Sequence, residues 1–367
     1  MFEAQVHTVP MEGPDDVSSV AALFDQGIVD PAHVTAIIAQ TEGDGHARGY
    51  SALSLQLLFA ERLAIARAEV SARIPMLMIG GTAGLMCPHV TLFVNKPAGG
   101  HAGNSEPRLA IGVTSTRTLL PEEYGTAAQI ELVADGVREA IKSAGIKSPD
   151  DVVCVEMKCP QMTARRMDDA AARGRKPVHS NPQVASSMSR GAAALGAALA
   201  LGEVPASEIA DSIVGRRTDL CTERGSASSG SEQIAVRIVV LGNVRGAPGR
   251  YVAANSVMRN QLDLDGARTA FRRAGLRLED GIVVPEDRSK VAAVFVNAGA
   301  DSLPTCGTRR HTMHSDLLAQ FSGHVAKAVA HANVAAIVQD TLVLGNAGAE
   351  HQGKPGSNLV CVVAKHG

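Results

Sequence analysis

The chain has 367 residues, which is longer than one ordinary domain and predicts two or three. Its formal net charge of -2 gives no electrostatic case for binding nucleic acid or an acidic membrane, and its lack of tryptophan argues against a base-stacking platform. The first residues show no signal-peptide pattern, and the longest apolar stretch, 192–201, is too short to span a bilayer. We therefore expect a soluble, cytoplasmic protein with no nucleic-acid or membrane partner.

One pattern recurs three times along the chain, and such repetition is the first signal to use in predicting a fold. Each copy has an apolar strand ending on a polar residue, an arginine opening an Ala/Leu-rich helix, and a second apolar strand beside a small-residue turn. The first strands are 34–40, 152–158 and 291–297. The helices are 50–70, 191–201 and 308–331. The second strands with their turns are 75–84, 226–241 and 335–348.

This alternation of strands and helices predicts an α/β fold with small sheets. The Gly/Pro-rich links 96–107 and 242–249 separate the copies. We predict three repeat units over residues 1–104, 112–248 and 251–367. Amphipathic patterns over 126–145 and 256–275 predict one further helix in the second unit and one in the third.

Three sets of residues occupy equivalent positions in the copies. The first strands end on Gln40, Lys158 and Asn297. The helices open with Arg48, Arg190 and Arg310, for which Arg309 is the alternative. The turns hold Ile79, Ser228 and Asn346. A single arginine at a helix start is commonly just solvated, but three in register, beside backbone N–H groups, predict three electropositive anchor points.

The second copy combines Lys158 with Ser228, which are the parts of a nucleophile pair. A lysine acts as a base when burial lowers its pKa, and a serine becomes a nucleophile when such a base takes its proton. On spacing alone, a surface lysine and a loop serine are the more common interpretation of such a pair. The equivalent positions in all three copies favour a catalytic pair over that interpretation.

The cysteines give little support for a metal centre. All six are scattered without CxxC spacing, which is typical of reduced thiols. Cys306, His311 and His314 are ligand types lying close together in the sequence, but their spacing matches no zinc pattern. We predict no metal there.

Seven short segments carry a resemblance that covers essentially the whole chain. They are Gln40-Thr-Glu-Gly-Asp-Gly45, Gly80-Gly-Thr82, Met157-Lys-Cys-Pro160, Ser189-Arg-Gly-Ala-Ala-Ala-Leu-Gly196, Ser228-Ser-Gly230, Arg309-Arg-His-Thr-Met313 and Ala349-Glu-His-Gln-Gly353. Together these segments resemble the cyanuric acid hydrolase and barbiturase family, the ring-opening amidohydrolases.

The resemblance implies three similar units with pseudo-threefold symmetry around a central active site. Each unit of the family normally offers a Lys, a Ser and an Arg to a flat cyclic amide with three carbonyls. The resemblance also implies no catalytic metal or organic cofactor, a structural divalent cation near the last motif, and commonly a homotetramer. It makes Ser228 the nucleophile and Lys158 the base. The implied substrate-binding residues are Gln40, Arg48, Ile79, Gly80, Arg190, Ser229, Asn297, Arg310, Asn346 and Ala347.

The sequence departs from the family pattern in the first and third units. Gln40 and Asn297 stand where the family has lysines. Ile79 and Asn346 stand where it has serines. Gly299 replaces an acidic residue, which argues against the structural cation, and Lys354 follows the last motif in place of proline. Gln40 and Asn297 can still donate hydrogen bonds to ring carbonyls, as can the backbone at Gly80 and Gly81.

The sequence thus predicts a hydrolase that opens a ring of the barbituric or cyanuric acid type. If the Ile79 side chain lies at one rim position, it favours a pyrimidine-type or otherwise asymmetric ring. The alternative is that Ile79 points into the core and only its backbone contacts the ligand. One alternative is an inactive or altered-ligand binding protein on the same scaffold, because two of the three Ser/Lys pairs are lost. Another is a metal-dependent amidohydrolase using Cys306, His311, His314 or His351.

Overall fold

The structure is a computed structural model that describes residues 2–43, 45–99, 106–299 and 303–366. It contains three four-stranded sheets, and the strands of each sheet come from one continuous stretch of the chain, within residues 2–97, 107–245 and 251–365. The second stretch begins at Pro107, ahead of the predicted start at residue 112. No helix in the described part of the chain is long and apolar enough to cross a membrane.

The three sheets share one strand order and one set of strand directions. In each sheet the first strand of the unit lies at one edge and pairs antiparallel with the last strand of the unit. That last strand pairs antiparallel with the first strand of the repeat pattern. A short strand at the other edge pairs parallel with the first strand of the repeat pattern. The first sheet is β1 (Phe2–Pro10), β4 (His89–Pro97), β2 (Val34–Gln40) and β3 (Met76–Ile79). The second is β5 (Pro107–Ser115), β8 (Arg237–Arg245), β6 (Val152–Pro160) and β7 (Gly225–Gly230). The third is β9 (Tyr251–Met258), β16 (Asn358–Lys365), β12 (Val291–Ala298) and β15 (Leu344–Ala347).

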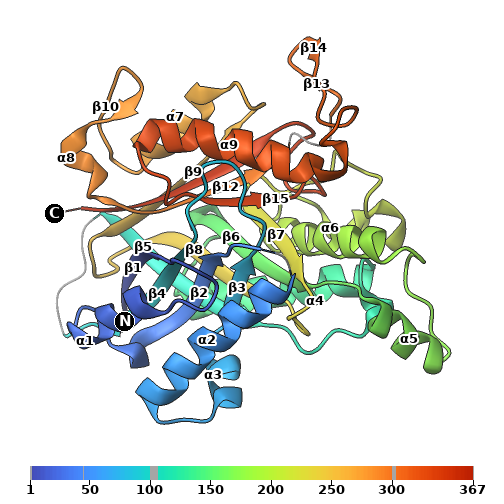
Figure 1. The fold of residues 1–367 in the computed structure, drawn as a ribbon, viewed down its shortest axis with the longest axis horizontal. Helices are drawn as coiled ribbons and strands as arrows, with labels where there is room; N and C mark the ends of the chain where they lie inside the picture. Colours follow the sequence, from blue (N-terminus) through green and yellow to red (C-terminus); the bar gives the residue numbers. More distant parts are fainter. Residues whose placement is uncertain (1, 44, 100–105, 300–302, 367) are drawn as a thin grey trace.

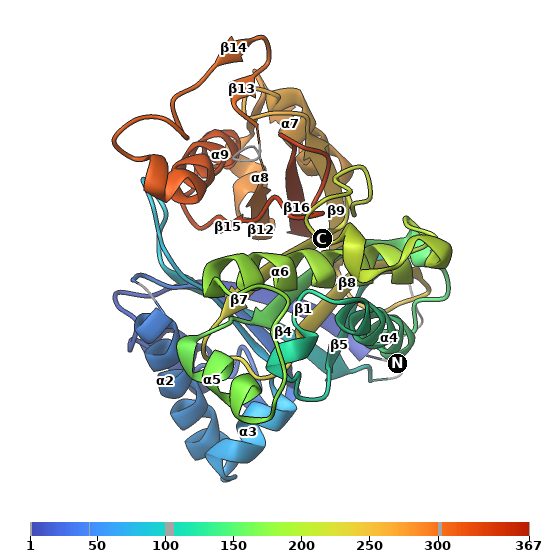
Figure 2. The ribbon, with the colours of Figure 1, turned by 90° about the vertical axis from the view of Figure 1, so that its right-hand side faces the viewer.

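Helices cover the outer face of each sheet (Figures 1 and 2). The first unit has α1 (Ser18–Asp25), α2 (Gly45–Leu63) and α3 (Arg67–Arg73). The second has α4 (Ala127–Ser143), α5 (Ala164–Ala172) and α6 (Pro182–Ala200). The third has α7 (Leu264–Arg273), α8 (Pro285–Arg288) and α9 (Ser322–Val338). Two small hairpins complete it, β10 (Leu278–Glu279) with β11 (Ile282–Val283), and β13 (Thr305–Cys306) with β14 (Arg309–Arg310).

The inner faces of the three sheets meet in one central apolar cluster. Because side chains alternate along a strand, every second residue of β2, β6 and β12 points to this cluster. Phe93 of the first unit and Phe295 of the third stack there with their ring centroids 6.3 Å apart. The alternate residues of β2, β6 and β12 point to the opposite face of each sheet, where they pack against the helices. The centre of the molecule is therefore where the three units share one core.

Several sequence predictions of local structure are wrong. Residues 226–230, predicted as a turn, form the strand β7, and the predicted helix 50–70 is divided into α2 and α3. The predicted helix 256–275 begins only at Leu264, because β9 extends to Met258.

The third helix does not begin at Thr308, because Gly307 has a φ of 59° and turns the chain into the β13–β14 hairpin; α9 begins at Ser322. Residues 335–338 are the end of that helix, and the strand is β15. The helix of the second copy begins at Pro182, capped by the Asn181 side chain, so Arg190 lies inside it.

Candidate active site

The predicted Lys, Ser and equivalent positions lie opposite one another in pairs. Where the parallel strands end, Gln40 pairs with Ile79, Lys158 with Ser228, and Asn297 with Asn346. Neighbouring strands are about 4.8 Å apart, and paired residues point to the same face. Their positions in the alternation place all six side chains on the inner face, above the central cluster. The structure therefore brings the three pairs to one place.

Lys158 is buried in this centre. It is 1% exposed, and burial lowers the pKa of its ammonium to about 7. The Glu232 carboxylate raises this pKa, while the Arg48 and Arg190 guanidinium groups lower it. A substantial fraction of Lys158 is therefore a neutral amine near neutral pH, the form that accepts a proton.

Ser228 is the partner of Lys158 on the edge strand β7. Its hydroxyl is buried, and Oγ has no hydrogen-bond partner among the described residues. One residue earlier, the N–H of Ala227 points away from β6 and donates to Oε1 of Gln352 at 2.7 Å. Because N–H directions alternate along a strand, the N–H of Ser229 points the same way, beside the nucleophile candidate. An N–H in that position is the kind that stabilises an oxyanion.

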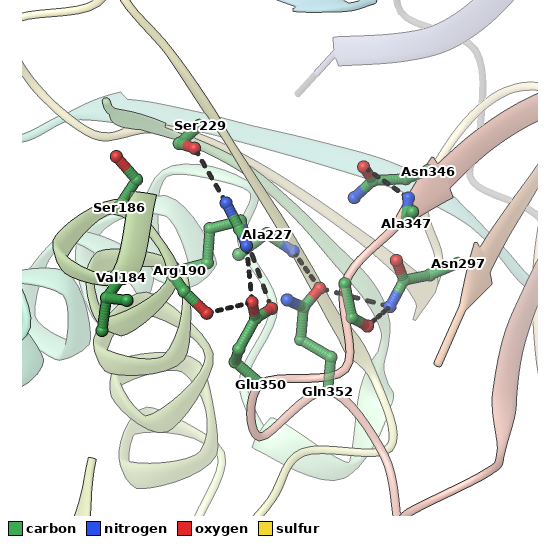
Figure 3. Close-up of polar contacts among 12 residues, drawn as sticks. Val184, Ser186, Arg190, Ala227, Ser229, Asn297, Asn346, Ala347, Glu350 and Gln352 are labelled. Carbon is green, nitrogen blue, oxygen red and sulfur yellow. Dashed lines mark hydrogen bonds and ion pairs between the residues drawn. The ribbon is translucent and has the colours of Figure 1, made fainter. Parts of the chain in front are cut away.

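Two arginines reach the centre from the helices, and each meets a carboxylate of the next unit. Nε of Arg48 lies 3.5 Å from Glu232. Arg190 pairs with Glu350 across the boundary between the second and third units, and its Nη1 lies 3.2 Å from Oγ of Ser229 (Figure 3). Burial raises the pKa of Glu350, but Arg190 more than offsets this and holds it below its usual value. Sequence reasoning missed both carboxylates, although Glu232 lies four residues after Ser228 and Glu350 lies four residues after Asn346.

The third cation is a lysine that the sequence reasoning did not select. Lys327 on α9 is 3% exposed, and its Nζ donates to the carbonyl oxygens of Gly80 and Gly81, at 2.9 Å each. A Cβ built on Gly345 would lie 3.3 Å from its Cγ. Lys327 thus lies beside β15 as Arg190 lies beside β7. One feature of the sequence could have identified Lys327, because it is the only lysine, arginine, aspartate or glutamate in the Ala/Val-rich helix α9.

Arg310 does not lie in this centre, and its prediction as the third helix-start anchor is wrong. It is exposed on β14, where it donates to the hydroxyl of Ser315. Its alternative, Arg309, is exposed on the same strand. Both arginines were assigned from a helix start that the hairpin replaces.

Gln40 links two units through both ends of its side-chain amide. Its Nε2 donates to the carbonyl of Ile79 at 3.1 Å, and its Oε1 accepts from the N–H of Gly345 at 2.9 Å. The side chain is fully buried. Gln40 therefore serves first as a bridge between the first and third units, where we had expected a donor to a ring carbonyl.

Asn297 presents an acceptor to the centre, where we had expected a donor. The Gln352 side-chain atom that accepts from the N–H of Ala227 must be the oxygen, Oε1. The Asn297 side-chain atom 3.2 Å from this oxygen is therefore the amide nitrogen, Nδ2 (Figure 3). Nδ2 also donates to the carbonyl of Gly348 at 3.1 Å, so both N–H groups are used. Oδ1 is buried without a partner among the described residues.

The remaining predicted contacts are partly used within the protein. Asn346 donates to Oγ of Ser226 and accepts from the N–H of Ala347. The N–H of Gly81 donates to the carbonyl of Gly43 at 3.0 Å, so it is not the ring donor we predicted. Ile79 is 4% exposed and packs in the central cluster. Gly80 lies against Arg48, whose Nη1 would be 2.6 Å from a Cβ at that glycine.

The described residues offer no group of three or more His, Cys, Asp and Glu that could hold a metal ion. The His351 ring is bonded to the carbonyl of Leu220 and the N–H of Gly215. At Gly299, a Cβ would lie 2.5 Å from the carbonyl oxygen of Ser357, so an acidic side chain has no room there.

Residues 5–365 match the family model of the amidohydrolase ring-opening proteins. The chain belongs to this family. Its membership makes it an amidohydrolase of the ring-opening type and confirms the resemblance that the seven segments carry.

Full-length relatives of this ring-opening amidohydrolase have related names. The cyanuric acid amidohydrolase of Enterobacter cloacae is 38% identical and covers 99% of this chain and 100% of its own. The cyclic amide hydrolase of Azorhizobium caulinodans is 36% identical, covering 98% and 99%. A solved cyanuric acid hydrolase, described as arising by structural concatenation, superposes with a TM-score of 0.94 at 34% identity over 100% of both chains. This match confirms the three-unit α/β fold.

Proposed function

We propose that this protein opens the ring of a cyclic amide of the barbituric or cyanuric acid type, with Ser228 as nucleophile and Lys158 as base. The observation that carries the proposal is the buried Ser228 hydroxyl, which has no hydrogen-bond partner among the described residues and lies opposite a lysine of lowered pKa. An unsatisfied buried hydroxyl costs stability, so its retention favours a catalytic role.

In the proposed reaction, neutral Lys158 takes the proton of Ser228 as Oγ attacks a ring carbonyl. The N–H of Ser229 stabilises the oxyanion. The C–N bond then breaks, and Lys158 returns its proton to the departing ring nitrogen. Water next hydrolyses the acyl-serine, which frees Ser228 and releases the open chain as a carboxylic or carbamic acid.

Other groups at the centre would hold the ring in place. Arg190 is held by hydrogen bonds to Glu350, and Arg48 lies 3.5 Å from Glu232 without a hydrogen bond between them. In the proposal both guanidinium groups bind the remaining ring carbonyls. Oδ1 of Asn297 is available to accept from a ring N–H. In this proposal the first and third units bind and orient the ring, while the second unit carries out the chemistry.

The first unit bears on which ring is preferred. Ile79 cannot accept a hydrogen bond, and an unpaired ring N–H buried against it would cost about 1–3 kcal/mol. A ring CH₂, as in barbituric acid, would pack there without this cost. The proposal therefore favours barbituric acid or another asymmetric ring over cyanuric acid.

The test is a screen of the purified protein against barbituric acid, cyanuric acid and related pyrimidine and triazine diones. Ring opening is followed by loss of ultraviolet absorbance and by detection of the open-chain product. Turnover of one of these rings is the expected result. If every ring binds and none opens, the chain is a binding protein on this scaffold and the proposed function is wrong.

A further inference from the structure

Lys327 lies at the boundary between the first and third units, where the turn after β3, the strand β15 and α9 meet. Its two contacts, the carbonyls of Gly80 and Gly81, both accept hydrogen bonds. A neutral amine has two N–H groups, so these carbonyls use both of them, whereas an ammonium has a third donor. Only the charged form of Lys327 therefore has an N–H left for another acceptor.

The titratable groups around Lys327 do not hold a proton on it. Burial, with smaller contributions from the charges of Lys158 on β6 and Arg48 on α2, lowers its pKa to about 7. On α9, burial and the Lys327 charge also lower the pKa values of His324 and His331. The turn 80–84 and β15 carry no titratable side chain. Lys327 is therefore mostly a neutral amine above pH 7.

The first unit lacks the carboxylate that the other two supply. Glu232 lies four residues after Ser228 and pairs with Arg48, and Glu350 lies four residues after Asn346 and pairs with Arg190. Four residues after Ile79 the chain has Ala83. Lys327 thus meets backbone carbonyls where the two arginines meet carboxylates.

We propose that Lys327 is the third cationic anchor of the site and that it takes up a proton when the ring binds as an anion. This inference rests on the proposed function. Cyanuric acid loses a proton from a ring N–H between two carbonyls, and barbituric acid loses one from the ring carbon between two carbonyls. In each anion the negative charge spreads onto both neighbouring oxygens. The bound anion replaces the missing carboxylate, a proton moves from a buffer acid to Nζ, and the new N–H donates to a ring oxygen. Lys327 thereby selects acidic imides over neutral cyclic amides.

The proton uptake is measured by calorimetry with the Ser228→Ala protein, which retains the site without the nucleophile. Barbituric acid and cyanuric acid are titrated at about pH 8 in two buffers of different ionisation enthalpy, where the lowered pKa leaves Lys327 mostly neutral. We expect each bound anion to take up close to one proton. Dihydrouracil is the matched control, because it has two carbonyls in place of three, is a much weaker acid and stays neutral at this pH. It should bind at least about tenfold more weakly without uptake.

Two further variants assign the proton. Ser228→Ala/Lys327→Arg is permanently charged and should bind barbituric acid with no uptake, and Ser228→Ala/Lys327→Met should bind it at least about tenfold more weakly. Undiminished uptake in either variant would place the proton elsewhere and overturn the inference, as would the failure of both acidic rings to bind. Wild-type turnover is measured separately: proton-linked binding without turnover contradicts the proposed function alone, and turnover without Lys327-dependent uptake contradicts this inference alone.

Discussion

The ends of the parallel strands have the same backbone pairing in the first and second units, but the side chains there differ in their hydrogen bonding and reactivity. Gln40 and Ile79 are paired in the same register as Lys158 and Ser228, on the same inner face. In the first unit the amide is bonded at both ends and the aliphatic side chain joins the core. In the second, Ser228 has a buried hydroxyl with no partner among the described residues, and Lys158 has a pKa of about 7.

This difference shows that one scaffold position can serve either stability or reactivity. A group whose hydrogen bonds are all made within the protein contributes to stability, as Gln40 does. A buried group left without partners costs stability, and its natural use is toward a ligand. Variants of the two units should therefore fail in different ways.

The largest effect is expected in the second unit. Lys158→Met removes the base, and kcat should fall about 10²- to 10⁴-fold, the usual contribution of a general base. Stability should not fall, because a buried amine is replaced by an apolar side chain of similar length. Activity is measured by ring opening, and stability by chemical unfolding. A Lys158→Met protein with wild-type kcat would remove the chemical distinction between the two units.

The pH dependence tests the same lysine without a mutation. Lys158 acts as a base only when neutral, and its pKa is about 7. Turnover should therefore fall about tenfold for each pH unit below that value. In Gln40→Ala the acid limb should stay in place, since Gln40 does not titrate. An acid limb lying near the ordinary lysine pKa in the wild-type protein would contradict the buried, neutral base.

The anchors give the next largest effect. Arg190→Lys loses the forked contact with Glu350 and Ser229, so KM should rise about tenfold or more. Arg310→Lys is the matched control, because Arg310 is exposed on β14, and it should leave both kcat and KM unchanged. Equal effects of the two substitutions would show that Arg190 is no closer to the ring than the hairpin is.

The smallest effect concerns Ile79. Ile79→Ser supplies a hydroxyl that can accept from a ring N–H, so the kcat/KM ratio of barbituric to cyanuric acid should fall several-fold or more. Some stability should be lost as well, because Ile79 packs in the central core. A ratio unmoved by the substitution would mean that Ile79 serves the core alone. A wild-type preference for cyanuric acid would contradict the proposed substrate choice.

Local patterns predicted what lies within one unit. The strands ending at Gln40, Lys158 and Asn297 follow from their apolar runs, and the equivalence of the three copies placed their partners correctly. The α/β fold class is confirmed. The helix start at Arg310 failed because a glycine with positive φ allowed a hairpin.

Contacts between units were beyond the reach of the sequence alone. Glu232, Glu350 and Gln352 act on residues of a neighbouring unit, at sequence separations that no local pattern encodes. Lys327 was missed for the same reason, because its partners are 246 and 247 residues away. The one signal that could have identified the two carboxylates is their equal spacing. Glu232 lies four residues after Ser228, and Glu350 lies four residues after Asn346.

The most direct test of the account is ring opening by Ser228→Ala, with Ser71→Ala on α3 as the control. Ser228→Ala should lose turnover by about 10⁴-fold or more while still binding the ring, and adding Lys158→Met should scarcely worsen it, because nucleophile and base act as a unit. Ser71→Ala should keep wild-type turnover. A folded Ser228→Ala protein that opens the ring within tenfold of the wild-type rate would contradict the central claim that Ser228 is the nucleophile.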